Sequence, residues 1–528
     1  MSDSLKRTAN PDAESLLIVG TIETLSRAAA SACEARSLRG AVLGCVVVGE
    51  HRPEMDMPAW FCGIPNLGHL DQLEEILSGT RAKTALLCLP GAMSTLLRRT
   101  QTDLERLGLK VRHLPLIEDI AAGLADPGIR AGAGSVDPAV LFDRPDRKVD
   151  PVLVRSVVGG KRVLITGAGG SIGSELARIC AAHDPSLLIL MDRSDNALFE
   201  IDRQLQATHP GVNRRVVLHD VVDSPRTLER MEELQAQVVF HAAAHKHVPL
   251  MEDHPAAAVN NNLFGTVAVA DAAIATGVER FVMISTDKAV NPTSVMGATK
   301  RMAELYVRSL NECQTSTRFG LVRFGNVLGS ACSVLPIWSK QIAEGGPVTV
   351  TDPEMTRYFM TIPEAASLVI QSAALVEPEA DGQSGREVFV LDMGEPVRIM
   401  DLATRFVAAH GLRAILPGSG SKSGCVTPGV RIQFTGKRPG EKLHEELVYD
   451  IEQLSETAVP GVRAWAGNRP VPEEVAAMLS AMSRLRNRTD VSGVIEAIGV
   501  YIPQINQTES GQSQVCVPNR ATLAADAA

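Results

Sequence analysis

Three features that assign a chain quickly to a class are missing from these 528 residues. No C-x-x-C pair occurs among the nine cysteines, so the sequence predicts neither a zinc site nor a disulfide framework, and reduced thiols are the simpler expectation. No apolar run approaches the ~20 residues of a membrane-spanning helix, and the first residues contain no signal-peptide core. The formal net charge of −9 argues against a general nucleic-acid binder. We therefore expect a cytoplasmic protein with no membrane span and no nucleic-acid partner.

The chain is too long for a single hydrophobic core, so two or three domains are expected. Short apolar strands alternate with helical stretches over residues 15–125, which predicts a smaller Rossmann-like α/β domain. Its first turn, VGTIETLSR, has side chains instead of glycines after Gly20, and Glu23 would repel a pyrophosphate. We expect this domain to be structural or regulatory rather than a working nucleotide site. The remaining segments are predicted to be a disordered N-terminus (1–14), a linker (126–157), a second and larger domain (158–503) and a disordered tail (504–528).

The larger domain opens with a strand, a glycine-rich turn and a helix, KRVLITGAGGSIGSELARIC. Gly167 is expected to make the tight turn, Gly170 to let backbone amides approach a pyrophosphate, and Gly173 to let the helix lie against the strand. The helix N-terminus would then present its dipole to the phosphates. The strand LLILMD ends at Asp192, about twenty residues later, where a carboxylate binds the adenosine ribose hydroxyls. The pattern predicts a doubly wound parallel sheet of the Rossmann type with a dinucleotide at its edge.

Asp192 favours NAD over NADP because a carboxylate repels a 2′-phosphate, whereas Arg193 directly behind it could attract one. Two further strands, RRVVLHD and AQVVFHAAA, bring Asp220 and three small residues to the same edge of the sheet. Asn262 follows on a helix, where a functional group and an ordinary solvated one are equally expected. The predicted cofactor-binding residues are Gly167, Gly170, Ser171, Ile172, Gly173, Asp192, Arg193, Asp220, Val221, Ala242, Ala243, Ala244 and Asn262.

The stretch ISTDKAVNPTSVMGATKR ends a strand, turns and enters a helix near Met296. Lys300 follows at the spacing of Y-x-x-x-K, the pair with which many nicotinamide enzymes remove a proton from a sugar hydroxyl. Met296 takes the place of the tyrosine, and a thioether has no ionisable proton. Asp287 and Lys288 instead supply a carboxyl group and an amine at the carboxyl end of a strand, where doubly wound sheets bind ligands. Taken alone, this pair would be interpreted as a solvated surface turn.

Seven blocks in order give the sequence a resemblance to a known family: TGAGGSIGSE, AAAHKHVPLME, STDKAVNPTSVMGATKR, RFGNVLGS, DPEMTRYFMTIPEA, VFVLDMGEPV and GKRPGEKLHEEL. They resemble the nucleoside-diphosphate-sugar 4,6-dehydratases of polysaccharide and glycan synthesis, in the extended short-chain dehydrogenase/reductase group. With methionine at position 296, the sequence resembles one branch of this family. That branch is similar to enzymes that dehydrate UDP-N-acetylglucosamine with retained configuration at C5. Larger family members carry membrane helices, which this chain is expected to lack. Cys332 departs from the family, which usually has glycine there.

The resemblance implies an NAD-dependent hydro-lyase acting on a UDP-sugar. It implies that Asp287 is the acid at C6, Lys288 is the base at C5 and Thr286 lies near the C4 hydroxyl. Lys300 would bind the nicotinamide ribose, with Met296 beside it. The expected substrate-binding residues are Lys246, Asn326, Arg357, Arg438 and Glu441.

Related enzymes also imply a homo-oligomer, a dimer or higher, whose subunits meet at helices over residues 256–276 and 296–312. No metal is expected at His241, His245 and His247, because hydride chemistry needs none. Two alternatives remain. One is a nucleotide-sugar 4-epimerase, which would need a tyrosine at the position of Met296, and the other is a catalytically silent NAD-binding scaffold.

Overall fold

A computed structural model of the chain describes residues 15–34, 42–49, 58–80, 82–89, 94–113, 150–313, 316–330, 333–376, 387–410, 412–417, 429–449, 452–465, 467 and 469–506. The predicted N-terminal segment 1–14, the predicted linker up to residue 149, Cys332 and residues 507–528 lie outside these residues. The described residues form two compact units. The first contains those before residue 114 together with 326–364 and 394–436, and the second contains 150–325, 365–393 and 437–506. The domain boundaries expected from the sequence stay predictions.

The first unit contains a six-stranded sheet with the strand order β3-β4-β2-β1-β5-β6. Its elements are β1 (Leu16–Gly20), α1 (Ile22–Glu34), β2 (Val42–Val47), β3 (Trp60–Phe61), β4 (Ile64–His69), α2 (Leu73–Gly79), β5 (Thr84–Cys88), α3 (Ser94–Arg106) and β6 (Lys110–His113). β1 is fully buried and runs parallel to β2 and β5, as strands alternating with helices predict. At the turn after β1, Thr21 Oγ1 accepts a hydrogen bond from Thr24 N at 3.3 Å. A side chain of the protein therefore takes up one amide at the start of α1.

The other segments of the first unit include a three-stranded parallel sheet, β14-β20-β19. Its strands are β14 (Val348–Val350), β19 (Arg413–Ile415) and β20 (Gly429–Phe434), and the accompanying helices are α13 (Val334–Ala343) and α15 (Ile399–Ala409). Trp338 of α13 packs beside Phe406 of α15, with ring centroids 5.7 Å apart. Two short pairs complete these segments: β13 (Asn326–Val327) with β16 (Phe359–Met360), and β15 (Thr356–Arg357) with β18 (Val397–Arg398).

The second unit is built on a nine-stranded sheet with the order β9-β8-β7-β10-β11-β12-β17-β22-β21. The first seven strands in this order are parallel to one another: β9 (Arg214–Leu218), β8 (Leu187–Asp192), β7 (Arg162–Thr166), β10 (Val238–His241), β11 (Arg280–Ile284), β12 (Arg318–Arg323) and β17 (Val388–Leu391). β22 (Val462–Trp465) and β21 (Ser455–Glu456) then add on in antiparallel fashion. The direction of the chain reverses beside β7, which is the switch point of a doubly wound sheet. The predicted fold class is confirmed.

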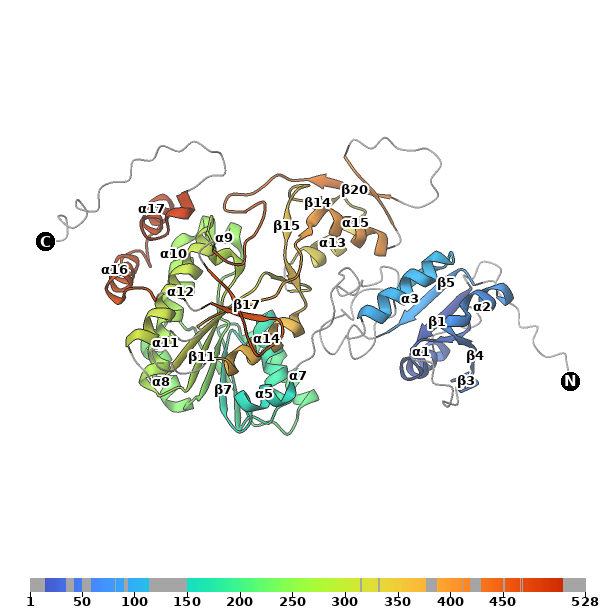
Figure 1. The fold of residues 1–528 in the computed structure, drawn as a ribbon, viewed down its shortest axis with the longest axis horizontal. Coiled ribbons are helices and arrows are strands. Elements are labelled where there is room, and N and C mark those ends of the chain that lie inside the picture. Colours follow the sequence, from blue (N-terminus) through green and yellow to red (C-terminus); the bar gives the residue numbers. More distant parts are fainter. Residues whose placement is uncertain are drawn as a thin grey trace. The chain divides into compact units, whose positions relative to one another are not determined.

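Helices cover both faces of this sheet (Figure 1). α8 (Ser224–Leu234), α11 (Gly265–Ala275) and α12 (Val295–Cys313) lie on one face, and α5 (Pro151–Val158), α7 (Asp195–Thr208) and α14 (Ile362–Ala374) lie on the other. β7, β8 and β10 are accordingly near-continuous apolar runs, because strands covered on both faces have no solvent side. In the described part of the chain, no helix has the length and apolar character needed to cross a membrane.

Two C-terminal helices, α16 (Pro472–Ser483) and α17 (Val491–Tyr501), pack against α12, and α17 also contacts α10 (Pro255–Ala258). Met478 and Met482 of α16 share one buried core with Met302 and Tyr306 of α12. Figure 1 shows both helices outside α12, on the side away from the sheet. Part of the helical surface expected to meet a second subunit is therefore covered by the chain itself.

Candidate active site

The glycine-rich turn between β7 and α6 (Ser171–Ala181) requires its glycines for close backbone approach. Gly167 has φ +67°, and a Cβ there would lie 2.7 Å from Ala243 N. A Cβ on Gly173 would lie 2.0 Å from the carbonyl oxygen of Gly167. Gly170 is the N-cap of α6 and makes no side-chain capping hydrogen bond, and a helix N-terminus binds anions through its backbone amides. Ser171 and Ile172 are the first residues of α6, and the backbone of Ala242 and Ala243 lies against Gly167, with Ala244 next in the same loop.

Asp192 ends β8 and is held against the glycine turn. Its Oδ2 accepts a hydrogen bond from Gly169 N, and its Oδ1 accepts one from Ser194 N, each at 3.0 Å. Arg193 pairs locally instead of pointing away: a guanidinium nitrogen is 3.8 Å from Asp220 Oδ2, and another is 3.1 Å from the ring of His245. Val221 follows Asp220 and is buried. The structure thus brings all the predicted adenosine-side residues to one edge of the sheet.

Asn262 is fully buried within a π-helical segment, η4 (Val259–Phe264), between α10 and α11. Its Oδ1 accepts the amide of His245 at 2.7 Å, and its Nδ2 donates to the carbonyl of His245 at 3.0 Å. Nδ2 also lies 3.2 Å from Thr299 Oγ1 of α12. The side chain therefore fastens the loop after β10 to α12. A solvated position, one of the two alternatives for this residue, does not describe it.

Three of the five catalytic residues expected from the sequence, Thr286, Asp287 and Lys288, form one turn after β11, which we call the catalytic turn; the other two, Met296 and Lys300, lie in α12. Thr286 Oγ1 accepts the amide of Lys288 at 3.4 Å and donates to Asp287 Oδ1 at 2.8 Å. Lys288 Nζ lies 3.0 Å from the same Oδ1. The Asp287 side chain is 0% exposed and that of Lys288 is 20% exposed. Asp287 Oδ2 is buried and has no hydrogen-bond partner among the described residues. A solvated surface pair is therefore ruled out, because the carboxyl group is inside the protein.

The first turn of α12 lies directly against this catalytic turn. A Cβ on Gly297 would lie 2.1 Å from the carbonyl oxygen of Lys288, so only glycine permits the approach. Met296 beside it is buried, at 4% exposure. Lys300, one turn along α12, is also buried; burial lowers its pKa to about 8, and the charge of Glu304 partly opposes that effect. The methionine and the lysine thus occupy the positions that the Y-x-x-x-K spacing predicts.

A segment from far along the chain holds the catalytic turn in place. We call residues 440–449 the strap. Lys442 Nζ donates to the carbonyl of Val290 at 2.9 Å, and Tyr449 Oη donates to the carbonyl of Ala289 at 3.0 Å. Asn291 Nδ2 donates to Glu446 Oε2 at 3.0 Å. These contacts were not expected from the sequence, where the GKRPGEKLHEEL block indicated only a diphosphate site.

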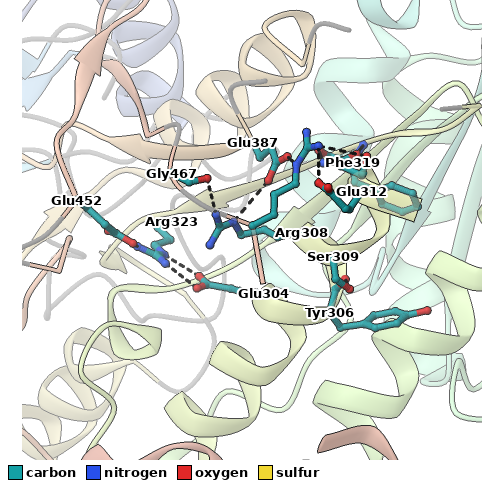
Figure 2. Close-up of polar contacts among 12 residues, drawn as sticks. Glu304, Tyr306, Arg308, Ser309, Glu312, Phe319, Arg323, Glu387, Glu452 and Gly467 are labelled. Carbon is teal, nitrogen blue, oxygen red and sulfur yellow. Dashed lines mark hydrogen bonds and ion pairs between the residues drawn. The ribbon is translucent and has the colours of Figure 1, made fainter. Parts of the chain in front are cut away.

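Beyond the strap, Glu452 joins a buried triad with Arg323 of β12 and Glu304 of α12 (Figure 2). Arg323 lies between the two carboxylates, with nitrogen–oxygen distances of 2.7 Å to each. Ser285 Oγ donates to Glu304 at 2.7 Å, so the triad also touches the residue before the catalytic turn. Burial alone would raise the pKa of Glu304, but the charge and hydrogen bonds of Arg323 outweigh it and hold that pKa at about 2.

The five predicted substrate-binding residues are distributed over the two units. In the second unit, Lys246 is exposed in the loop after β10. Two guanidinium nitrogens of Arg438 donate to one carboxylate oxygen of Glu441, Oε1, at 2.6 and 3.0 Å. In the first unit, Arg357 is buried and one of its guanidinium nitrogens donates to the carbonyl of Thr356 at 2.7 Å. The Asn326 amide donates to the carbonyl of Tyr358 at 3.0 Å. Their roles stay predictions.

These features define a doubly wound α/β enzyme fold with a dinucleotide-type turn and a buried acid–amine pair at the strand ends. Residues 163–465 match the family model described as polysaccharide biosynthesis protein, and the chain belongs to that family. The resemblance inferred from the seven sequence blocks is confirmed.

Individual relatives agree with this family. The chain is 43% identical over 386 residues to the capsular polysaccharide biosynthesis protein CapD of Staphylococcus aureus, covering 72% of this chain and 60% of that protein. It is 32% identical over 292 residues to a UDP-N-acetylglucosamine 4,6-dehydratase (inverting) of Campylobacter jejuni, covering 54% of this chain and 77% of the relative. The crystal structure of Pen from Bacillus thuringiensis has 32% identity and a TM-score of 0.51, covering 60% of this chain and 91% of that one. The chain thus spans less than two thirds of the length of CapD.

Proposed function

We propose that this protein is an NAD-dependent UDP-sugar 4,6-dehydratase of polysaccharide or glycoconjugate biosynthesis. The substrate we propose is UDP-N-acetylglucosamine, and the product is the UDP-4-keto-6-deoxy sugar with retained configuration at C5. The observation that carries the proposal is the buried Asp287–Lys288 pair at the end of β11, beside a helix with methionine in the tyrosine position. An acid and an amine at one strand end supply what a dehydration needs and a simple oxidation does not.

The residues at the switch point fit a dinucleotide. At Gly167 and Gly173 the backbone segments pack too closely for any side chain, as the tight turn of a dinucleotide site requires, and the start of α6 offers amides to a pyrophosphate. Asp192 would bind the adenosine ribose, and Lys300 the nicotinamide ribose. A nicotinamide held there would supply a hydride acceptor for C4 of the sugar and a hydride donor for C6. Asp192 and the Arg193–Asp220 pairing both favour NAD over its 2′-phosphorylated form.

The protein's own residues move the protons. A ketone at C4 acidifies the C5 hydrogen, and the amine of Lys288 removes it as a proton. The carboxyl group of Asp287 gives its proton to the C6 hydroxyl, which leaves as water. As the C4 hydroxyl is oxidised, its proton passes through Thr286, whose Oγ1 donates to Asp287 Oδ1, to the Asp287 carboxylate, and this is the proton that Asp287 later gives to the C6 hydroxyl. Lys288 returns its own proton to C5 when hydride is delivered to C6. Positioned groups of this kind each contribute roughly 10²–10⁴-fold to the rate.

The diphosphate of the substrate would be bound by arginine, whose planar fork matches phosphate oxygens. In the second unit, the proposed diphosphate ligand is Arg438. Its side chain is 59% exposed, and the contact seen for it is with its neighbour Glu441. Arg357 and Asn326 belong to the first unit, and their proposed part in substrate binding rests on the family blocks alone. Lys246, exposed after β10, is proposed to contact the sugar.

A 4-epimerase uses the same hydride exchange but has no need of a buried acid–amine pair. Incubation of the purified protein with UDP-N-acetylglucosamine, followed by mass spectrometry, separates the possibilities. Loss of one water supports the dehydratase. An isobaric product with inverted C4 would show an epimerase, and unchanged substrate would indicate a scaffold.

We also propose that the protein works in the cytoplasm as a homo-oligomer. Since α16 and α17 already pack on α12, we place the contact between subunits elsewhere than on that part of α12. Size-exclusion chromatography with light scattering measures the assembly directly.

A further inference from the structure

Lys288 lies between two carboxyl groups that come from distant parts of the chain. Its Nζ is 3.0 Å from Asp287 Oδ1 and 3.6 Å from Glu445 Oε1. The Glu445 side chain is only 3% exposed. Removing a carboxylate from water costs several kcal/mol, which is recovered only when the group is paired. The second carboxyl group at Lys288 therefore calls for an explanation that the Asp287–Lys288 pair alone does not provide.

The position of Glu445 is fixed by its neighbours in the strap. Lys442 and Tyr449, on either side of it in sequence, hydrogen-bond to backbone carbonyls of the segment that follows Lys288. Glu446, the adjacent residue, faces a different way and pairs with Asn291 and Lys442. The two consecutive glutamates thus have separate partners, and only Glu445 is seen to reach the amine.

We propose that Glu445 is a positioning residue for Lys288, and the proposal rests on the dehydratase function above. In the elimination step the C5–H bond breaks and its proton passes to the neutral amine of Lys288. The electron pair of that bond forms the C5–C6 double bond as the C6–O bond breaks. The departing oxygen takes the proton of Asp287 and leaves as water.

After this step Lys288 is an ammonium group, Asp287 is a carboxylate and Glu445 is unchanged. A fixed carboxylate beside the amine aims its lone pair and stabilises the ammonium as it forms. The carboxylate behind the histidine of a catalytic triad acts on its base in the same way. Glu445 does this without touching the substrate, so it is expected to affect turnover more than substrate binding.

The test compares Glu445→Gln, Glu445→Asp and Glu446→Gln in the full-length protein. Glu445→Gln should lower kcat by roughly 10–100-fold, with KM changed less than about threefold. Exchange of the C5 hydrogen with solvent deuterium should fall in parallel. Glu445→Asp keeps the charge and should recover part of the loss. Glu446→Gln loosens the strap but leaves both Asp287 and Glu445 beside the amine of Lys288. The loss of kcat in this variant should therefore be at least about tenfold smaller than in Glu445→Gln.

A second measurement does not depend on turnover. At a fixed pH, an amine-reactive reagent labels the neutral fraction of a lysine, and peptide mass spectrometry reads the labelling of Lys288. Glu445→Gln should label faster than both wild type and Glu446→Gln, because the ammonium has lost a partner. Equal kcat and equal labelling in the Glu445 and Glu446 variants would overturn the role of Glu445. A wild-type protein that leaves the sugar unchanged would overturn the proposed function instead. The labelling rates would then still show whether Glu445 contacts the amine of Lys288.

Discussion

Met296 is buried in the first turn of α12, four residues before Lys300, and its neighbour Gly297 closes against the carbonyl of Lys288. A tyrosine at position 296 would bring a phenolic proton to the sugar, whereas the thioether brings none. The spacing of these residues could be read from the sequence, because a helix and its four-residue step are local properties. The burial of Asp287 could not, since it depends on what packs over the turn.

Met296→Ala should lower kcat by about tenfold at most, about 1.4 kcal/mol, because only packing is lost. Asp287→Asn keeps the shape of the acid without its proton, and Lys288→Met removes the base, so each should cost at least ~10²-fold. The Lys288 variant should also stop deuterium exchange at C5 while still allowing a ketone and reduced cofactor to accumulate. Steady-state kinetics and absorbance of the reduced cofactor measure both effects. Near-normal turnover in the Asp287 or the Lys288 variant would move the search for the base to Lys246 or His247.

Asp192 allows a second prediction at the scale of one residue. Calorimetric titration should show tighter binding of NAD than of NADP, because the negatively charged 2′-phosphate would approach the Asp192 carboxylate. That carboxylate is held in place by hydrogen bonds that it accepts from Gly169 N and Ser194 N. Asp192→Asn removes the repulsion and should narrow the preference. A wild-type preference for the phosphorylated cofactor would show that Arg193 leaves Asp220 and dominates the site.

At the scale of elements, the strap and the buried triad join α12, β12 and the end of β11 to residues more than a hundred positions away. The strands and helices themselves were predictable from their apolar periods. The strap was not, because its hydrogen bonds to backbone carbonyls leave no periodic trace in the sequence. Arg438 and Glu441 illustrate the same limit: the family block named them as substrate ligands, a role that stays a prediction, but gave no sign that they pair with each other.

The triad gives a stability prediction with a defined dependence on pH. Glu304→Gln leaves Arg323 with one carboxylate fewer, so the free energy of unfolding at pH 7 should fall by about 3–5 kcal/mol. The pKa of Glu304 is about 2 in the folded protein, against 4.5 ordinarily. A lowered pKa stabilises the fold above the ordinary value, and that stabilisation is lost as pH falls towards 2. The difference between variant and wild type should therefore shrink below pH 4.5 in urea unfolding curves.

Glu200 is the matched control for this experiment. Its pKa is also about 2, first because of its hydrogen bond from Arg203, yet its side chain is 48% exposed. Water screens that pair, so Glu200→Gln should cost less than ~1 kcal/mol. Equal losses in the two variants would mean that burial adds nothing to the triad.

At the scale of the whole molecule, the proposed chemistry uses residues of 158–449 and none of the six-stranded sheet. We therefore expect removal of residues 1–145 to leave turnover measurable, because the turn after β1 carries Thr21 and Glu23 where a nucleotide site would have glycines. Assay of the truncated protein, after its circular dichroism and NAD binding have been checked, measures this. A folded, cofactor-bound truncation without any turnover would assign a catalytic part to the first domain.

The contact between Lys288 and Glu445, 157 positions later, also has a consequence for the nascent chain during synthesis. A ribosome adds about 5–20 residues per second, so roughly ten to thirty seconds separate the synthesis of the catalytic turn from that of its strap. Over that interval β17 lacks its partner β22, and α12 lacks the cover of α16. The catalytic turn therefore has no means of taking its final shape while the chain is incomplete. We therefore expect the proposed activity to begin only once nearly the whole domain has left the ribosome, and a chain released before the strap is made to lack it.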